Sequence, residues 1–204
     1  MNLPNKISLT RICLIPVFIA VFFITAIPFH YGIAAIIFAV AALTDFVDGK
    51  IARKYGLVTN LGKFLDSIAD KVLISIAMML LLTLKEDLFA KMGVSTDALY
   101  IGMVVCVCII LARELLISAF RQIAAANGVI MAAEKLGKYK TACQDVATFV
   151  LILAADLFVY ANQTAGVVVT WIGLALFVAA TVLTIVSGIS YVVKNKQVLK
   201  DSDK

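Results

Sequence analysis

The sequence is poor in charge, histidine, proline and cysteine for its length. Only 15% of its 204 residues are charged, where about 25% is usual for a soluble domain. Hydrophobic residues make up 63%, and the mean hydropathy is +1.04. A soluble fold of this size cannot bury so much apolar surface in one core, and disordered chains are poor in apolar residues. The composition therefore indicates an integral membrane protein.

The scarcity of histidine and cysteine also limits the chemistry. His30 is the one histidine, and the four cysteines form no C-x-x-C pair. A Ser–His–Asp relay or a His-rich zinc site is not expected from this inventory. We interpret the cysteines as small apolar residues within helices. With 11 glycines and 3 prolines, a collagen-like chain is excluded as well. Any chemistry must rest on carboxylates and basic residues.

Six apolar stretches are long enough to cross the membrane as helices, which takes about 20 residues each. They lie near residues 7–27, 31–52, 63–84, 98–126, 139–159 and 166–193. The first is too long for the apolar region of a signal peptide, so we expect it to be a transmembrane helix. Short connections predict antiparallel neighbours. We expect one all-α transmembrane domain over residues 1–204, with six helices in a single bundle.

The basic residues predict the orientation of this bundle. If the N-terminus is cytoplasmic, 16 of the 18 basic residues fall on the inner side, as the positive-inside rule requires. These are Lys6, Arg11, Lys50, Arg53, Lys54, Lys63, Lys71, Arg113, Arg121, Lys135, Lys138, Lys140, Lys194, Lys196, Lys200 and Lys204. We therefore expect both termini on the cytoplasmic side of the cell membrane. Beyond topology, a basic inner face attracts anionic head groups or phosphorylated substrates.

Four aspartates gather where the second predicted helix ends and the third begins. Asp45 and Asp48 are three residues apart, and Asp66 and Asp70 are four apart. These spacings place each pair on one face of its helix. The short turn between the helices makes a hairpin, so the two pairs can face each other at one depth.

Four ionised carboxylates so close together need compensation. Each costs roughly 2.5–3.5 kcal/mol at the centre of a transmembrane helix, less near the interface, and they repel one another. Paired interfacial charges with nearby Lys and Arg are the structural alternative. Two divalent cations would neutralise all four, and an all-oxygen ligand set suits Mg²⁺ or Mn²⁺. Two metals held this way can clamp the attacking and leaving oxygens of a phosphoryl displacement.

The residues around the aspartates form a longer pattern. It reads Asp-x2-Asp-Gly-x2-Ala-Arg-x8-Gly-x3-Asp-x3-Asp and consists of Asp45, Asp48, Gly49, Ala52, Arg53, Gly62, Asp66 and Asp70. This pattern resembles the signature of the CDP-alcohol phosphatidyltransferases. The six-helix layout with cytoplasmic termini is similar to that family too, so the resemblance extends over nearly the whole chain.

The resemblance implies an activity and roles for the motif residues. Members of this family transfer a phosphatidyl group from a CDP-linked lipid to an alcohol and release CMP. The implied metal ligands are Asp45, Asp48, Asp66 and Asp70, and Asp70 is also the implied general base. The residues expected to bind the nucleotide and diphosphate are Asn5, Gly49, Ala52, Arg53, Gly62 and Lys63. CDP-diacylglycerol and the bilayer are expected partners, a homodimer is implied by the family, and no nucleic acid is expected.

The acceptor alcohol is suggested by two further segments. Asn5, Ser8 and Arg11 recur at intervals of three near the N-terminus, and Gly137 opens a Gly-Lys-x-Lys-Thr stretch. Both resemble the branch of the family that uses sn-glycerol 3-phosphate and makes phosphatidylglycerophosphate. A phosphorylated acceptor needs cations beside the metals. The residues expected to supply them are Arg113, Arg121, Lys135 and Lys138.

Several alternatives stay open at this level. Arg113 could pair with Glu114 or Asp145, and Lys135, Lys138 and Lys140 could serve topology alone. The acceptor could be inositol phosphate, serine or phosphatidylglycerol. A protein of another class, a divalent-cation transporter, could also use membrane carboxylates. Its site is expected near the midplane on broken helices, whereas these aspartates cluster at one end beside basic residues.

Overall fold

Six long helices make up most of the chain that the structure describes. The computed structural model describes residues 3–54, 59–93, 96–126 and 135–195. Within them the α-helices are α1 (Leu3–Phe23), α2 (His30–Lys54), α3 (Asn60–Thr83), α4 (Thr96–Ala126), α5 (Lys135–Tyr160) and α6 (Gln163–Lys194). The predicted all-helical architecture is confirmed for the described residues, and each predicted stretch corresponds to one helix.

The apolar character of these helices suits a membrane. α1, α4, α5 and α6 are each long and apolar enough to cross one, and α3 qualifies when it is counted together with the bent segment after it. The described apolar part of α2 is the shorter stretch His30–Thr44. The chain is thus a membrane protein with four or five candidate spans, while six spans and cytoplasmic termini stay predictions.

Two features of the backbone differ from the sequence prediction: the end of α1 and a bent segment after α3. α1 ends at Phe23 rather than near residue 27, and Phe29 adopts a left-handed backbone with φ of 58°. Pro28 precedes Phe29, and this reversal turns the chain into α2. After α3 the chain bends by 58° into a short segment, Lys85–Met92, made of η1 (Lys85–Phe89) and η2 (Ala90–Met92). Its residues Leu88 and Phe89 are fully buried, so packing rather than periodicity holds it in place.

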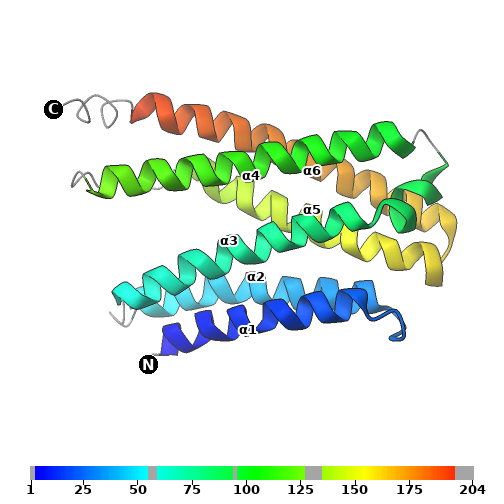
Figure 1. Cartoon of the computed structure of the whole chain (residues 1–204), viewed down its shortest axis with the longest axis horizontal. Helices are drawn as coiled ribbons and strands as arrows, with labels where there is room; N and C mark the ends of the chain where they lie inside the picture. Colours follow the sequence, from blue (N-terminus) through cyan, green and yellow to red (C-terminus); the bar gives the residue numbers. More distant parts are fainter. Residues whose placement is uncertain (1–2, 55–58, 94–95, 127–134, 196–204) are drawn as a thin grey trace.

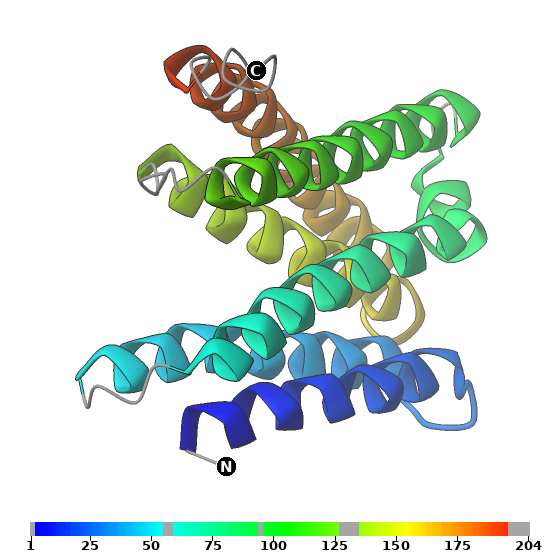
Figure 2. The same cartoon turned by 60° about the vertical axis from the view of Figure 1, so that its left-hand side comes forward.

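The ends of the helices are grouped in space. The start of α1, the end of α2, the start of α3 and the end of α6 lie at one end of the bundle (Figures 1 and 2). We call it the hairpin end, after the α2–α3 connection. Both aspartate pairs belong to helix turns at this end. The fold therefore collects the polar part of an otherwise apolar chain in one place.

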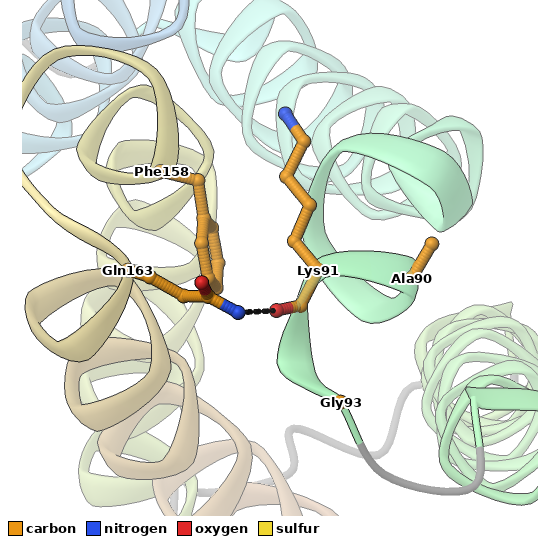
Figure 3. Close-up of a pocket in the computed structure, with 5 residues that line it drawn as sticks. All are labelled: Ala90, Lys91, Gly93, Phe158 and Gln163. Atoms are coloured by element: carbon orange, nitrogen blue, oxygen red, sulfur yellow. Dashed lines mark hydrogen bonds between the residues drawn. The ribbon is translucent and has the colours of Figure 1, made fainter.

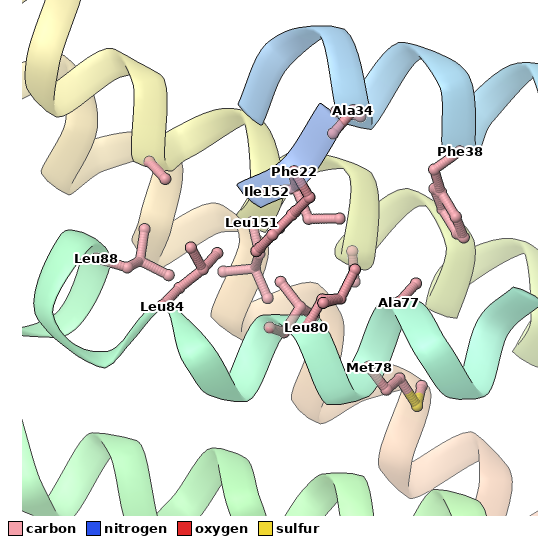
Figure 4. Packing of buried hydrophobic residues seen from close by; sticks show 14 of the residues in the cluster. Phe22, Ala34, Phe38, Ala77, Met78, Leu80, Leu84, Leu88, Leu151 and Ile152 are labelled. Carbon is pink, nitrogen blue, oxygen red and sulfur yellow. The ribbon is translucent and has the colours of Figure 1, made fainter. Parts of the chain in front are cut away.

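The main core cluster takes buried residues from all six helices and from the bent segment, and Figure 4 shows part of it. Phe22 meets Tyr31 edge to face at 5.1 Å between ring centroids. The side chains of Phe38, Leu81 and Leu151 are at most 1% exposed. This packing fixes the rigid frame on which the polar end is built.

α6 packs closely on α5 through small residues. Most of its buried residues recur in steps of four and three, namely Gly166, Thr170, Gly173, Phe177, Ala180, Thr184, Ser187 and Tyr191, and Thr181 and Gly188 are buried beside them. Such a stripe lets two helix backbones approach within a membrane, where lipid provides no hydrophobic drive for association. A Cβ on Gly173 would lie 2.7 Å from Cδ2 of Leu151. The close packing therefore requires glycine there.

A buried carboxylate joins α5 to α2 at the opposite end. The Asp156 Oδ2 atom accepts a hydrogen bond from the Gly32 backbone N–H, and Asp156 is only 3% exposed. Gly32 lies in the first turn of α2, where backbone N–H groups lack partners inside the helix. Phe29, just before this helix, has no side-chain acceptor to cap it. Asp156 supplies that cap from another helix.

We predict that Gly173→Ala destabilises the bundle by about 1–3 kcal/mol, because the added methyl group overpacks a buried contact. Thermal unfolding of the detergent-purified protein measures this as a lower Tm. Gly102→Ala is the matched control, because a Cβ there meets nothing within 4 Å, and it should not lower the Tm. Equal Tm values for the two variants would contradict the close α5–α6 packing.

Candidate active site

The aspartate hairpin is the first part of the candidate site. Asp45 and Asp48 lie in the last three turns of α2, and Asp66 and Asp70 lie in the first three turns of α3. Asp66 keeps 46% of its side chain exposed, and Asp70 is exposed. The two helices are neighbours. Some predicted site residues have side chains outside the described residues, namely Asp45, Asp48, Gly49, Ala52, Arg53, Lys63 and Lys135.

The first turn of α3 is fixed by a cap and by a contact from α1. Thr59 Oγ1 accepts from the Gly62 N–H at 3.0 Å and donates to Asn5 Oδ1 at 3.3 Å. Asn5 is 5% exposed. A Cβ on Gly62 would overlap the Asn5 amide oxygen. Gly62 is thus explained by the close approach of Asn5, and both predicted site residues belong to one buried contact at the hairpin.

Asp66 is held by a cation that was not among the predicted site residues. The Arg11 Nη1 atom lies 3.4 Å from Asp66 Oδ1, and the Arg11 side chain is 1% exposed. Its Nε donates to Thr44 Oγ1 at 3.4 Å. Thr44 directly precedes Asp45 in α2. The guanidinium therefore bridges the two helices that carry the aspartates.

A second polar cluster joins α4, α5 and α6. The Arg113 Nη1 atom donates to Glu114 Oε1 at 3.2 Å, and its Nη2 donates to Ser187 Oγ at 3.0 Å. Lys140 donates to the same Glu114 oxygen and is 3% exposed as a residue. A Cβ on Gly188 would lie 3.1 Å from Arg113 Cγ. The Arg113 side chain consequently lies flat on α6, with Glu114 between two cations.

The two parts of the site interact electrostatically. The Lys140 ammonium interacts with Arg113, Asp70 and Asp145. Buried charges act on one another more strongly than exposed ones because less water screens them. Lys140 therefore connects the cationic cluster of α4 and α5 with Asp70 on α3.

The other predicted acceptor cations occupy outer positions. Arg121 is exposed, its Nε donates to Tyr191 Oη at 3.2 Å, and its guanidinium stacks over that ring. Lys138 is exposed as well. The buried face of α5 includes Lys140, Gln144, Ala147, Thr148 and Leu151. Lys140 lies four residues before Gln144 and eight before Thr148, so helical spacing places it on this buried face, unlike Lys138. This spacing is a signal that could have identified Lys140 from the sequence.

A separate cavity lies at the opposite end of the bundle. It measures about 240 Å³ and is lined by Ala90, Lys91, Gly93, Phe158 and Gln163. Figure 3 shows Gln163 donating to the Lys91 carbonyl oxygen across it, at 3.3 Å. Among the described residues that line it, Lys91 is the charged one. Its position and its lining give it no part in the chemistry of the aspartates.

The donor set at the hairpin end suits a hard divalent cation. Asp66 and Asp70 offer carboxylate oxygens one helical turn apart, as a metal bound to one face of α3 would need. Among the described residues no group of three His, Cys, Asp or Glu side chains is close enough to hold a metal. The pair on α2 would have to complete the ligand set.

The chain is similar to proteins named as phosphatidyltransferases over nearly its whole length. It is 36% identical to a CDP-diacylglycerol–glycerol-3-phosphate 3-phosphatidyltransferase of Bacillus subtilis, over 99% of both chains. It is 38% identical to the protein of that name from Rickettsia bellii over 93% of both. For Shigella flexneri serotype 5b the identity is 36%, over 93% of this chain and 92% of the relative. Residues 1–186 match the family described as CDP-alcohol phosphatidyltransferase. The protein thus belongs to the CDP-alcohol phosphatidyltransferase family.

Proposed function

We propose that this protein transfers the phosphatidyl group of CDP-diacylglycerol to a hydroxyl of sn-glycerol 3-phosphate. The products are phosphatidylglycerophosphate and CMP. Relatives named for that activity align with 93–99% of the chain at 36–38% identity. The observation that carries the choice of acceptor is the buried Lys140, which joins Arg113 at Glu114 and interacts with Asp70. A phosphate beside those cations would bring its hydroxyl toward the aspartates.

The reaction assigns distinct tasks to the aspartates. Asp45, Asp48, Asp66 and Asp70 would hold two divalent cations, Mg²⁺ or Mn²⁺, which supply positive charge to the diphosphate and to the leaving CMP. Asp70 accepts the proton from the acceptor hydroxyl. The freed oxygen forms a bond to the phosphorus of the phosphatidyl group, and the bond from that phosphorus to the CMP oxygen breaks. CMP leaves with the electron pair.

The remaining polar residues bind and orient the substrates. Asn5, Gly49, Ala52, Arg53, Gly62 and Lys63 surround the nucleotide and diphosphate in this proposal. Arg113 and Lys140 bind the phosphate of the acceptor, while Arg121, Lys135 and Lys138 attract it on its approach. The site faces the cytoplasm, where a soluble phosphorylated alcohol is available to a lipid-bound donor. The homodimer implied by the family resemblance belongs to this proposal and stays a prediction.

We predict that the purified protein releases CMP from CDP-diacylglycerol only when Mg²⁺ or Mn²⁺ and glycerol 3-phosphate are both present. A panel with glycerol 3-phosphate, inositol phosphate, serine and phosphatidylglycerol measures the acceptor choice directly. CMP release with another acceptor, and none with glycerol 3-phosphate, would identify a different acceptor for the same type of reaction. Divalent-cation flux into liposomes without any CMP release would instead support the transporter alternative.

We predict that Asp70→Asn lowers kcat by at least ~100-fold, because general-base catalysis typically contributes 10²–10⁴-fold. The matched control is Asp97→Asn, which removes an exposed carboxylate in the first turn of α4 and should leave kcat unchanged. CMP release at saturating substrates measures both variants. Full activity of Asp70→Asn would rule out its role as the base.

We predict that Lys140→Gln raises the KM for glycerol 3-phosphate by about 10-fold or more, because a hydrogen bond to a charged group contributes about 1.5–3 kcal/mol. The KM for CDP-diacylglycerol should change little. Lys138→Gln should raise the acceptor KM by a smaller factor because Lys138 is exposed, and Lys91→Gln in the distant cavity should have no effect. If Lys138→Gln has the larger effect, the phosphate lies outside the buried cluster.

A further inference from the structure

Arg11 is a charged residue buried within an apolar helix. Its side chain is 1% exposed and is the largest of the fully buried side chains. Burying a guanidinium in a membrane helix is unfavourable unless specific partners receive its hydrogen bonds. The proposed reaction gives Arg11 no direct contact with either substrate. Its burial therefore needs an explanation of its own.

The contacts of Arg11 lie on both acid-bearing helices. One end of the guanidinium lies 3.4 Å from Asp66 Oδ1 on α3, and its Nε lies 3.4 Å from Thr44 Oγ1 on α2. The Thr44 hydroxyl in turn donates to the Ala41 carbonyl at 2.6 Å, which orients its lone pairs toward Arg11. A planar guanidinium holds two partners in a fixed relative geometry, whereas the donors of an ammonium rotate on a flexible stem.

The same face of α1 makes a second attachment to the hairpin. Asn5, Ser8 and Arg11 are 5%, 3% and 1% exposed and recur every three residues. Asn5 accepts a hydrogen bond from Thr59 at the start of α3. Arg11 contacts Asp66 two turns further along α3. α1 therefore holds α3 at two points along the segment that carries the aspartates.

We propose that Arg11 is a positioning residue of the metal site, orienting the Asp66 carboxylate and fixing α2 at Thr44, directly before Asp45. This inference rests on the proposed function, in which those aspartates hold divalent cations. It predicts that removing Arg11 changes the metal affinity in the direction opposite to the one expected from charge repulsion alone. A guanidinium near a metal site repels the metal, so removing it should strengthen metal binding. If Arg11 positions Asp66, removing it weakens metal binding.

The direction of the change in Mn²⁺ affinity can be measured without catalytic turnover. The wild-type protein and its variants are placed in lipid nanodiscs without substrate, and free Mn²⁺ is followed by electron paramagnetic resonance during a titration. Arg11→Gln should raise the Mn²⁺ dissociation constant by about 10-fold or more, as is typical when a residue that orients a metal ligand is lost. Lys91→Gln, which removes one positive charge at the opposite end of the bundle, should bind Mn²⁺ like the wild type. Unchanged or tighter binding by folded Arg11→Gln overturns the inference.

Two milder variants cover the case in which Arg11→Gln does not fold. Arg11→Lys keeps the charge but loses the rigid fork, and Thr44→Val keeps Arg11 but removes its contact on α2. Both should weaken Mn²⁺ binding, Thr44→Val by about 2–10-fold, the range expected for one hydrogen bond. Wild-type dissociation constants in both variants would overturn the inference while leaving the proposed reaction intact. A wild-type protein that binds no Mn²⁺ would contradict the metal site itself, and the inference with it.

Discussion

A carboxylate at the end of an apolar helical bundle needs positive charge within contact distance, and this requirement organises the whole hairpin end. Asp66 meets it through Arg11, which comes from a different helix and is itself almost completely buried. Glu114 meets it twice over, through Arg113 and Lys140. Arg11 and Lys140 reach their carboxylates from another helix, whereas Arg113 is the neighbour of Glu114 within α4. Ion pairs consequently hold the helices together at the hairpin end, whereas apolar packing holds them together further along the bundle.

The apolar part of the fold determines where these charges can meet. Along α6, small buried residues in steps of four and three allow close packing on α5. The same stripe continues to Ser187, Gly188 and Tyr191 at the hairpin end. There Ser187 accepts from Arg113, Gly188 leaves room for its side chain, and Tyr191 accepts from Arg121. One periodic pattern thus serves membrane packing over most of its length and a cationic cluster at its end.

Periodicity was enough to predict the helices, and with them the placement of both aspartate-bearing helix ends at one end of the bundle, because helix formation depends on local spacing along the chain. The facing of the four aspartate side chains stays a prediction. The bent segment Lys85–Met92 was not predicted, since its place depends on tertiary burial of Leu88 and Phe89. The partner of Asp66 was missed for a similar reason. Arg11 is 55 residues away in the sequence, and its position fits the positive-inside rule equally well. A pattern of charges shows which side of the membrane a cation occupies, but not which carboxylate it contacts.

The two kinds of positive charge in the proposed site have different consequences for catalysis. A guanidinium is covalently fixed and always charged, so it can hold a ligand in place before any metal or substrate arrives. A divalent cation can contact the diphosphate as the leaving group develops charge, which Arg11 cannot do while it is buried between α1, α2 and α3. Preorganisation lowers the reorganisation that the reaction requires. We therefore regard the buried arginine as part of the frame of the site and the proposed metals as its reactive component. Burial places the permanent charge inside, and the exchangeable charges would bind at the exposed side of Asp66 and Asp70.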